Sequence, residues 1–459
     1  MNNRSKSLSY TLAFIVLTCL FFMWGFFTVL NDILIPHLKS VFDLTHFQAM
    51  LVQFAFFGAY FIGSLIYFII SVSLGDPINK IGYKGGILLG LALSSIGSAL
   101  FYPATYIHQY WFYLMALFIV GLGFTLLQIA ANPYVAVLGK PETASSRLNL
   151  VQAFNSLGTT IGPAIGGYLI FHYFAGVQAV KIPYLIYAGI FLLLAFVIIL
   201  VKLPKITNPH EKVTGFGSLH YKNLVLGIVA IFMYVGAEVS IGSILISFLG
   251  LDEIAGLNSA DASTFLSFYW GGLMIGRFLG AISLSDMKNT ILKYWIMIGI
   301  PLLAFFTVFY LSNLQTASIY GIFLMINLLA FHFGKSQAGR TLTIFSLIII
   351  GLLIISLGFT GTVAMWAVIA IGLFNSIMWS NIFTLAINGL GKYTSQASSM
   401  LVMAILGGAI IPPLQGKVAD IWGVHFSFIV PVFSYIYLAF YGWRGYEVTK
   451  FKKFIKKNN

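Results

Sequence analysis

Three ionisable residues lie inside long apolar stretches of the sequence, where a charged side chain is costly. Asp32 follows Asn31 in the first stretch, Glu238 lies within YVGAEVSIGS, and Arg277 lies within GRFLG. A carboxylate in such a position can bind and release H⁺, or ligate Na⁺. Either acid could instead pair with Arg277 and only hold the fold together. Asp32 and Glu238 are therefore candidate sites for a coupling cation, H⁺ or Na⁺, and no other metal or cofactor is predicted.

Side-chain amides form a second set of polar residues in apolar stretches. Gln128 and Asn132 are four residues apart, so they share one face of a helix, and three more amides follow at three-residue spacing from Asn149. Amides both donate and accept hydrogen bonds, which suits a ligand rich in hydroxyl groups. A single amide could equally join two helices, at about 0.6–2 kcal/mol. The candidate substrate ligands are Asn31, Gln128, Asn132, Gln152, Asn155, Asn375 and Asn381.

Three tryptophans, Trp24, Trp270 and Trp379, also lie within apolar stretches. Tryptophan in membrane proteins usually collects at the interface between lipid and water, so these positions are unusual. A sugar has an apolar face that stacks on an aromatic ring, although packing against lipid or protein explains each tryptophan equally well by itself. Their presence together with the amides favours a ligand role for one or two of them.

The composition places all of these residues in a membrane protein. Hydrophobic residues make up 59% of the 459 and charged residues only 8%, a balance foreign to soluble domains. Apolar runs such as 8–30, 47–74, 224–249 and 340–358 meet the requirement of roughly 20 residues for crossing a bilayer. Backbone groups in lipid must bond internally, and the alternation of a β-barrel is missing, so the runs are predicted to be helices. The predicted fold class is all-α, with many crossings of the lipid bilayer.

The net charge of +13 does not indicate a nucleic-acid partner, because the basic residues fall mainly in alternate predicted loops. Lys39, Lys181 and Lys417 are the only ones on the opposite side. The positive-inside rule then predicts that both termini are cytoplasmic. The motifs HExxH and GxSxG are absent from the sequence, as is an aspartyl pair at catalytic spacing, so we do not expect an enzyme.

The chain divides into two halves around a polar stretch. We expect an N-terminal six-helix bundle over residues 1–202, a cytoplasmic linker over 203–222, and a C-terminal bundle over 223–459. The spanning segments of the first half are expected near 10–36, 47–74, 85–106, 110–138, 146–173 and 182–202.

The two halves repeat each other weakly, as duplicated transporter bundles do. Asn132 and Pro163 recur as Asn381 and Pro412 with a common offset of 249 residues, whereas Gly58 recurs as Gly272 with an offset of 214. The offset therefore grows by 35 residues, which predicts an inserted helix pair at about 290–334. The total is fourteen crossings, of which twelve form the repeated core.

Several long motifs in this order resemble the major facilitator superfamily, and within it the fucose, galactose and glucose cation symporters. The motifs include LNDILIP, LQIAANPYVAVLG, RLNLVQAFNSLG, YVGAEVSIGS, YWGGLMIGRFLGA, GLFNSIMWSNIF and LVMAILGGAIIPPLQGKVAD. The resemblance covers nearly the whole chain except the insertion. It implies a fold of two helix bundles that moves a sugar by alternating access.

The resemblance also implies roles for single residues. The first-helix acid of the fucose–proton branch matches Asp32, and its fifth-helix amides match Gln152 and Asn155. Gln128 stands where that branch has a glutamate, which makes the chain more similar to the glucose/galactose branch. The implied activity is uptake of a hexose with a cation by a monomer in the bacterial inner membrane. The alternative is a multidrug/proton antiporter, whose apolar pocket would not need the amides.

Overall fold

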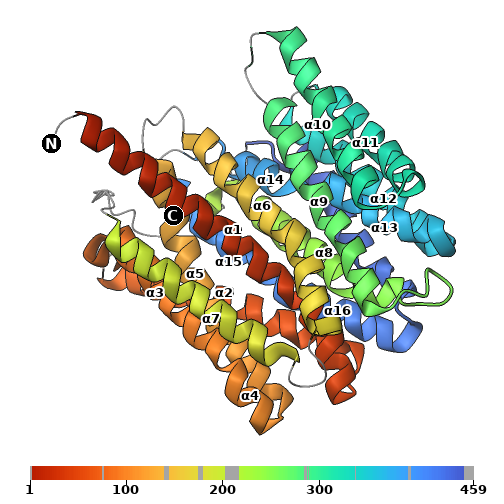
Figure 1. Cartoon of the computed structure of the whole chain (residues 1–459). Helices are drawn as coiled ribbons and strands as arrows, with labels where there is room; N and C mark the ends of the chain where they lie inside the picture. The colour runs from red at the N-terminus through yellow and green to blue at the C-terminus, as the bar shows by residue number, and fades with distance from the viewer. Residues whose placement is uncertain are drawn as a thin grey trace, which may run out of the picture.

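The computed structural model describes most of the chain, and over this part every regular element is a helix (Figure 1). The described residues are 3–74, 77–138, 144–173, 179–201, 217–283, 287, 289–335, 337–390 and 394–448. The prediction of an all-α fold is confirmed. Most of the linker expected at 203–222 lies outside the described residues.

The first half forms a bundle of long helices that we call the N-terminal bundle. Its elements are α1 (Asn3–Phe42), α2 (His46–Leu74), α3 (Pro77–Ala99) with its continuation α4 (Phe101–Ile107), α5 (Tyr110–Val137), α6 (Ala144–Gly167) with the π-helix η2 (Tyr168–Tyr173), and α7 (Lys181–Leu200). Figure 1 shows α3, α5 and α7 at the outer side of this bundle, and α1 and α6 toward the other half.

The second half forms the C-terminal bundle. Its elements are α8 (Lys222–Leu249), α9 (Ser259–Ser283), α10 (Thr290–Leu311), α11 (Leu314–Gly334), α12 (Ala338–Gly358), α13 (Gly361–Asn375) with α14 (Met378–Ile387), α15 (Thr394–Met403) with the 3₁₀ turn η6 (Ala404–Leu406) and α16 (Gly407–Trp422), and α17 (Ile429–Phe440) with the π-helix η8 (Tyr441–Gly445).

Thirteen helical stretches in the described part are long and apolar enough to cross a membrane. The helix α6 is not among them, because many Ser, Thr, Asn, Gln and Gly residues interrupt its apolar face. It nevertheless lies between α1 and α9 and packs against both (Figure 1). Counting α6, the fourteen predicted crossings are confirmed, and the protein is a multi-pass membrane protein.

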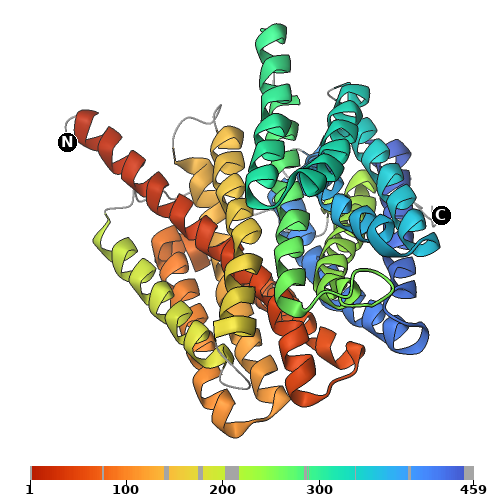
Figure 2. The same cartoon turned by 45° about the vertical axis from the view of Figure 1, so that its right-hand side comes forward.

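The inserted helix pair is α10 and α11, which pack on α9, α12 and α13 at the outer edge of the C-terminal bundle (Figure 2). Asn289 and Asn313 cap the two helices, because their side chains accept hydrogen bonds from the N–H groups of Leu292 and Thr316. Apolar side chains of α10 such as Leu303 are largely exposed. This surface suits contact with lipid.

Two glycines show the internal repeat in three dimensions. A Cβ atom on Gly158 of α6 would overlap the carbonyl oxygen of Phe22 on α1, and one on Gly407 would overlap the carbonyl oxygen of Phe232 on α8. Gly158 and Gly407 are separated by 249 residues, the offset of Asn132 from Asn381 and of Pro163 from Pro412. Small residues of this kind let two membrane helices approach closely, so these two helix pairs are tightly packed at equivalent places in the two bundles.

Candidate functional site

The carboxylate of Asp32 lies where the two bundles meet, and only 3% of the residue is exposed. Its Oδ1 accepts hydrogen bonds from Gln53 Nε2 on α2 at 2.9 Å and from Ser243 Oγ on α8 at 3.0 Å. Its Oδ2 accepts one from Trp270 Nε1 on α9 at 3.2 Å. Gln53 Nε2 also donates to Ser243 Oγ at 2.8 Å. Because Gln53 belongs to the N-terminal bundle and the other two partners to the C-terminal bundle, this Asp32 cluster joins them.

Local sequence features make room for the Asp32 cluster. Pro36 has no N–H group, so the carbonyl of Asp32 loses its usual helical partner one turn later. On the facing helix α8, a Cβ atom at Gly242 would lie 3.4 Å from Asp32 Oδ2 and 3.0 Å from the Trp270 ring. A methyl group at Gly242 would therefore crowd the Trp270 ring and just touch the Asp32 carboxylate.

Glu238 lies on α8, five residues before Ser243, and is 9% exposed. Its side chain interacts electrostatically with Tyr234 and Arg277, and it is near enough to Asp32 for the two acids to interact. The two predicted coupling residues therefore lie in one region of the protein, although Glu238 is not a hydrogen-bonded member of the Asp32 cluster.

Arg277 does not form the direct ion pair that would have given the acids a purely structural role. Its guanidinium donates hydrogen bonds to the hydroxyl of Ser156 on α6 and to the carbonyl of Ser376. Among the residues that the structure describes, neither Asp32 nor Glu238 lies within 4.0 Å of it as an ion-pair partner. Arg277 thus acts on Glu238 through space and links the two bundles through Ser156.

The structure brings together three of the predicted amides at the contact of α5 and α6. Gln152 Nε2 donates to Asn132 Oδ1 at 3.4 Å, and Asn132 Nδ2 donates to the carbonyl of Gln128 at 3.3 Å. All three are partly exposed. Asn155 faces α1, where its Nδ2 donates to the carbonyl of Phe21 at 2.9 Å. The side chain of Asn149 lies outside the described residues.

Asn31 and Trp24 lie on α1 with Asp32 and are both buried. Within the described part of the chain, Asn31 Nδ2 has no hydrogen-bond partner. Trp24 Nε1 donates to the hydroxyl of Tyr60 on α2 at 3.2 Å, and its ring packs edge to face against Phe124. Trp24 therefore fills the interior of the N-terminal bundle.

The candidates on α13 and α14 contact other helices of the C-terminal bundle. Asn375 is fully buried, and its side chain bonds the hydroxyls of Tyr269 and Tyr435 at 3.0 and 2.7 Å. Asn381 Nδ2 donates to the carbonyl of Ala338 at 3.2 Å, and Trp379 stacks on a neighbouring phenylalanine of its own helix. The structure does not bring these three residues into contact with the Asp32 cluster.

Two members of the Asp32 cluster, Gln53 and Ser243, were missed by the sequence analysis. A signal existed for Gln53, because it is an amide in the middle of the long apolar run 47–74. Ser243 stands at the end of the same YVGAEVSIGS stretch that contains Glu238, but a serine in a membrane helix often bonds only its own backbone.

A second contact between the bundles lies at the end of the molecule where α2 begins. The carboxylate of Asp420 on α16 accepts hydrogen bonds from the backbone N–H groups of His46 and Phe47 at 2.6 and 2.9 Å. Near the same end, Gly167 lies directly against Ser263 of α9. The bundles are therefore in close contact at this end.

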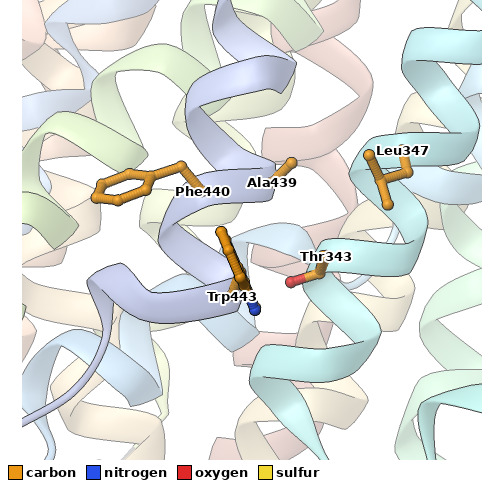
Figure 3. Close-up of a pocket in the computed structure, with 5 residues that line it drawn as sticks. All are labelled: Thr343, Leu347, Ala439, Phe440 and Trp443. Carbon is orange, nitrogen blue, oxygen red and sulfur yellow. The ribbon is translucent and has the colours of Figure 1, made fainter.

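The surface recess in Figure 3 is separate from this site. It has a volume of about 430 Å³ and lies between α12 and the end of α17, with Thr343, Leu347, Ala439, Phe440 and Trp443 around it. Its lining is mostly apolar and shares no residue with the Asp32 cluster or the amides. It suits an acyl chain better than a polar substrate.

The fold and this arrangement of buried polar groups can be compared with known proteins. Residues 12–338 match the sequence model of the Major Facilitator Superfamily. The chain belongs to the major facilitator superfamily. It is 43% identical to the glucose/galactose transporter of Brucella abortus (strain 2308), over 96% of each chain. It is 32% identical to the L-fucose-proton symporter of Escherichia coli (strain K12), over 92% of this chain and 90% of that one.

A solved structure of the same superfamily matches the whole fold. The crystal structure of the transporter FucP in the outward conformation covers 95% of this chain and 98% of its own, with a TM-score of 0.65 and 30% sequence identity. The resemblance inferred from the motifs is therefore confirmed, as is the two-bundle fold of this superfamily.

Proposed function

We propose that this protein is a secondary transporter that takes up a hexose together with a cation by alternating access. Glucose and galactose are the first sugars to test and L-fucose the third, because the relatives' names contain these sugars. The observation that carries the proposal is the position of Asp32, whose buried carboxylate accepts hydrogen bonds from both bundles. A change in the charge of Asp32 therefore changes the contact between the N-terminal and C-terminal bundles, which must move relative to each other during transport.

The surroundings of Asp32 support H⁺ over Na⁺ as the coupling cation. Two of its three partners present N–H groups to the carboxylate, and an indole N–H can only donate. A sodium ion would need oxygen ligands at these places, whereas a proton needs only the carboxylate. The likeness to an L-fucose-proton symporter supports the same choice.

The amides on α5 and α6 supply the sugar site in this proposal. Gln128, Asn132 and Gln152 are partly exposed and lie together, so their donors and acceptors are accessible to hydroxyl groups. Trp270 presents a half-buried ring beside Asp32, which places an aromatic surface at the same bundle contact. Asn155, Trp24, Asn375, Trp379 and Asn381 remain weaker candidates because each already bonds to or packs against its own bundle. Asn31 keeps an unpartnered Nδ2 among the described residues, but it is buried.

We further propose that the protein works as a monomer in the bacterial inner membrane, with both termini cytoplasmic, and that it is not an enzyme. In this orientation the end at which α2 begins is extracellular. The bonds from His46 and Phe47 to Asp420 then close the extracellular side. The alternative of a multidrug/proton antiporter gains no support from the relatives.

Uptake of radiolabelled sugars into proteoliposomes tests the proposal. Glucose, galactose and L-fucose are each measured with an imposed pH gradient and, separately, with an imposed Na⁺ gradient. We expect accumulation of at least one sugar with the pH gradient. In Asp32→Asn, accumulation should disappear while exchange of labelled for unlabelled sugar persists. Failure of the wild-type protein to accumulate any of the three sugars would reject the assignment.

A further inference from the structure

The Asp32 cluster contains one buried acceptor that its present hydrogen bonds do not use. Gln53 is 2% exposed, and its Nε2 donates to both Asp32 and Ser243. Its Oε1 has no hydrogen-bond partner among the described residues. A buried amide oxygen without a partner costs free energy, so it calls for an explanation.

Protonation of Asp32 would change what its neighbours must provide. An ionised carboxylate only accepts hydrogen bonds, so three surrounding donors suit it, whereas a protonated carboxyl also has an O–H group that needs an acceptor. Trp270 cannot supply one. The hydroxyl of Ser243 accepts from Gln53 and donates to Asp32, so accepting from a protonated Asp32 would require it to turn its own O–H group elsewhere. Gln53 Oε1 is the acceptor in the cluster that has no partner among the described residues, and rotation of the amide by half a turn would bring it to the place that Nε2 now occupies.

We propose that Gln53 is a positioning residue whose amide turns over when Asp32 takes up its proton. With Asp32 ionised, Nε2 faces the carboxylate and Ser243, and α1, α2 and α8 are held together. With Asp32 protonated by a proton from solvent, Oε1 accepts the new O–H group. The donor that bridged Asp32 and Ser243 then points away. Proton binding thereby exchanges charge-assisted hydrogen bonds between the bundles for a neutral one within the N-terminal bundle.

No charged side chain among the described residues hydrogen-bonds to Asp32, so none of them can take the positioning role proposed for Gln53. The side chains that contact the carboxylate from α2, α8 and α9 are all uncharged. Glu238 on α8 interacts with Asp32 only electrostatically and, among the described residues, makes no hydrogen bond to it. Arg277 on α9 directs its guanidinium to Ser156 and Ser376.

The inference rests on the proposed coupling role of Asp32, and its test is the pH dependence of sugar affinity. In Gln53→Met, which has a side chain of similar length without polar groups, the ionised carboxylate loses a donor. In the wild type we expect KM for sugar exchange to rise with pH as Asp32 loses its proton. In Gln53→Met the proton is lost at higher pH, so this rise in KM should move up by about half a pH unit or more, while the maximal exchange rate at acidic pH is retained. Gln48→Met makes the same substitution in the first turn of the same helix, and its pH profile should match the wild type.

A second variant and a second measurement keep the test decisive. Ser243→Ala removes another donor to Asp32 and should shift the pH profile in the same direction. Ser240→Ala is its control, because the Ser240 hydroxyl donates to the carbonyl of Ala237 in its own helix and to no other described residue. The fluorescence of Trp270, identified as the part of the signal that Trp270→Phe removes, can be titrated with pH in the absence of sugar. The wild-type signal should change over a defined pH range. The midpoint of this change should move to higher pH in Gln53→Met, and the change should be absent in Asp32→Asn.

The two proposals fail in different ways. Coincident pH profiles for wild type, Gln53→Met and Ser243→Ala would overturn the role of Gln53 even if the protein accumulates sugar with protons. A moving fluorescence transition in a protein that accumulates none of the sugars would retain the amide switch and reject the proposed substrates.

Discussion

Asp420 accepts a hydrogen bond from the backbone N–H group of His46, at 2.6 Å, across the boundary between the bundles. The first turn of α2 has N–H groups without helical partners and lies at the positive end of the helix dipole. The Asp420 carboxylate meets both needs, and its second oxygen bonds Phe47. This contact stabilises the form in which the bundles are closed at this end.

Asp420→Asn should therefore favour the form that is open at the end where α2 begins. The lost charge interaction with a helix N-terminus corresponds to about 0.3–1 kcal/mol, or a shift of roughly two- to fivefold in the two populations. The measurement is the rate at which Ser263→Cys is alkylated in a Cys19→Ser background. Ser263 is buried at the same end of the molecule, so its alkylation reports the open form. Asp43→Asn, an exposed acid in the turn before α2, is the control. Equal alkylation rates in both variants would mean that the contact of Asp420 with His46 and Phe47 does not hold this end closed.

Arg277 and Glu238 should show a measurable coupling although they form no direct ion pair. Arg277→Gln leaves the buried Glu238 without a nearby positive charge and should lower the unfolding temperature, and Glu238→Gln should relieve part of that loss. A double-mutant cycle in detergent is expected to give an interaction of about 0.5–3 kcal/mol. Strictly additive effects would mean that Arg277 acts only through Ser156 and Ser376.

Amides that bind sugar should be separable from amides that hold helices together. Gln152→Leu should raise KM for sugar by about tenfold, as expected for one lost hydrogen bond of about 1.4 kcal/mol, with little change in thermal stability. Asn327→Leu is the matched control, because Asn327 is buried in the inserted pair and donates to the carbonyl of Leu373. It should lower the unfolding temperature and leave KM unchanged. The reverse pattern would remove Gln152 from the sugar site.

The repeated glycines should be equally intolerant of a methyl group. Gly158→Ala and Gly407→Ala each place a Cβ atom on a backbone carbonyl, which cannot move aside easily, and should cost about 1–3 kcal/mol of stability. Gly189→Ala and Gly299→Ala add the same atom where no heavy atom lies within 4 Å. Unfolding temperatures measured in detergent compare the two pairs. Alanine favours a helix over glycine, so a destabilisation at Gly189 as large as that at Gly158 would show that lipid contact, not close packing on a carbonyl, decides the outcome.

The sequence predicted most of the fold because membrane helices are defined by length and hydrophobicity. A crossing was also predicted at 146–173, where the structure has α6, a helix whose polar residues keep it below a hydropathy criterion. The insertion followed from a change in the repeat offset, which needs no knowledge of packing. Asp32 was predicted because any carboxylate in such a stretch needs an explanation.

The contacts of Asp32 with Gln53, Ser243 and Trp270 could not be predicted in the same way. Ser243 follows Asp32 by 211 residues, and its hydroxyl meets the carboxylate only through the packing of α8 on α1. Helices that are buried on all sides also lack an amphipathic stripe. The hydrophobic pattern of α13 therefore does not predict which of its faces is directed toward the other bundle. Asn375 is an example, since its amide bonds two tyrosines within its own bundle.

The inserted pair α10 and α11 has a practical consequence for observing transport. The helices on which it packs, α9, α12 and α13, all belong to the C-terminal bundle, so the pair should travel with that bundle as one rigid body. Its turn at Ser312 and Asn313 is distant in sequence from every residue of the Asp32 cluster and from the amides of α5 and α6. A dye attached at this turn, with a second dye on the outer helix α7, would report the distance between the two bundles during transport without blocking the substrate.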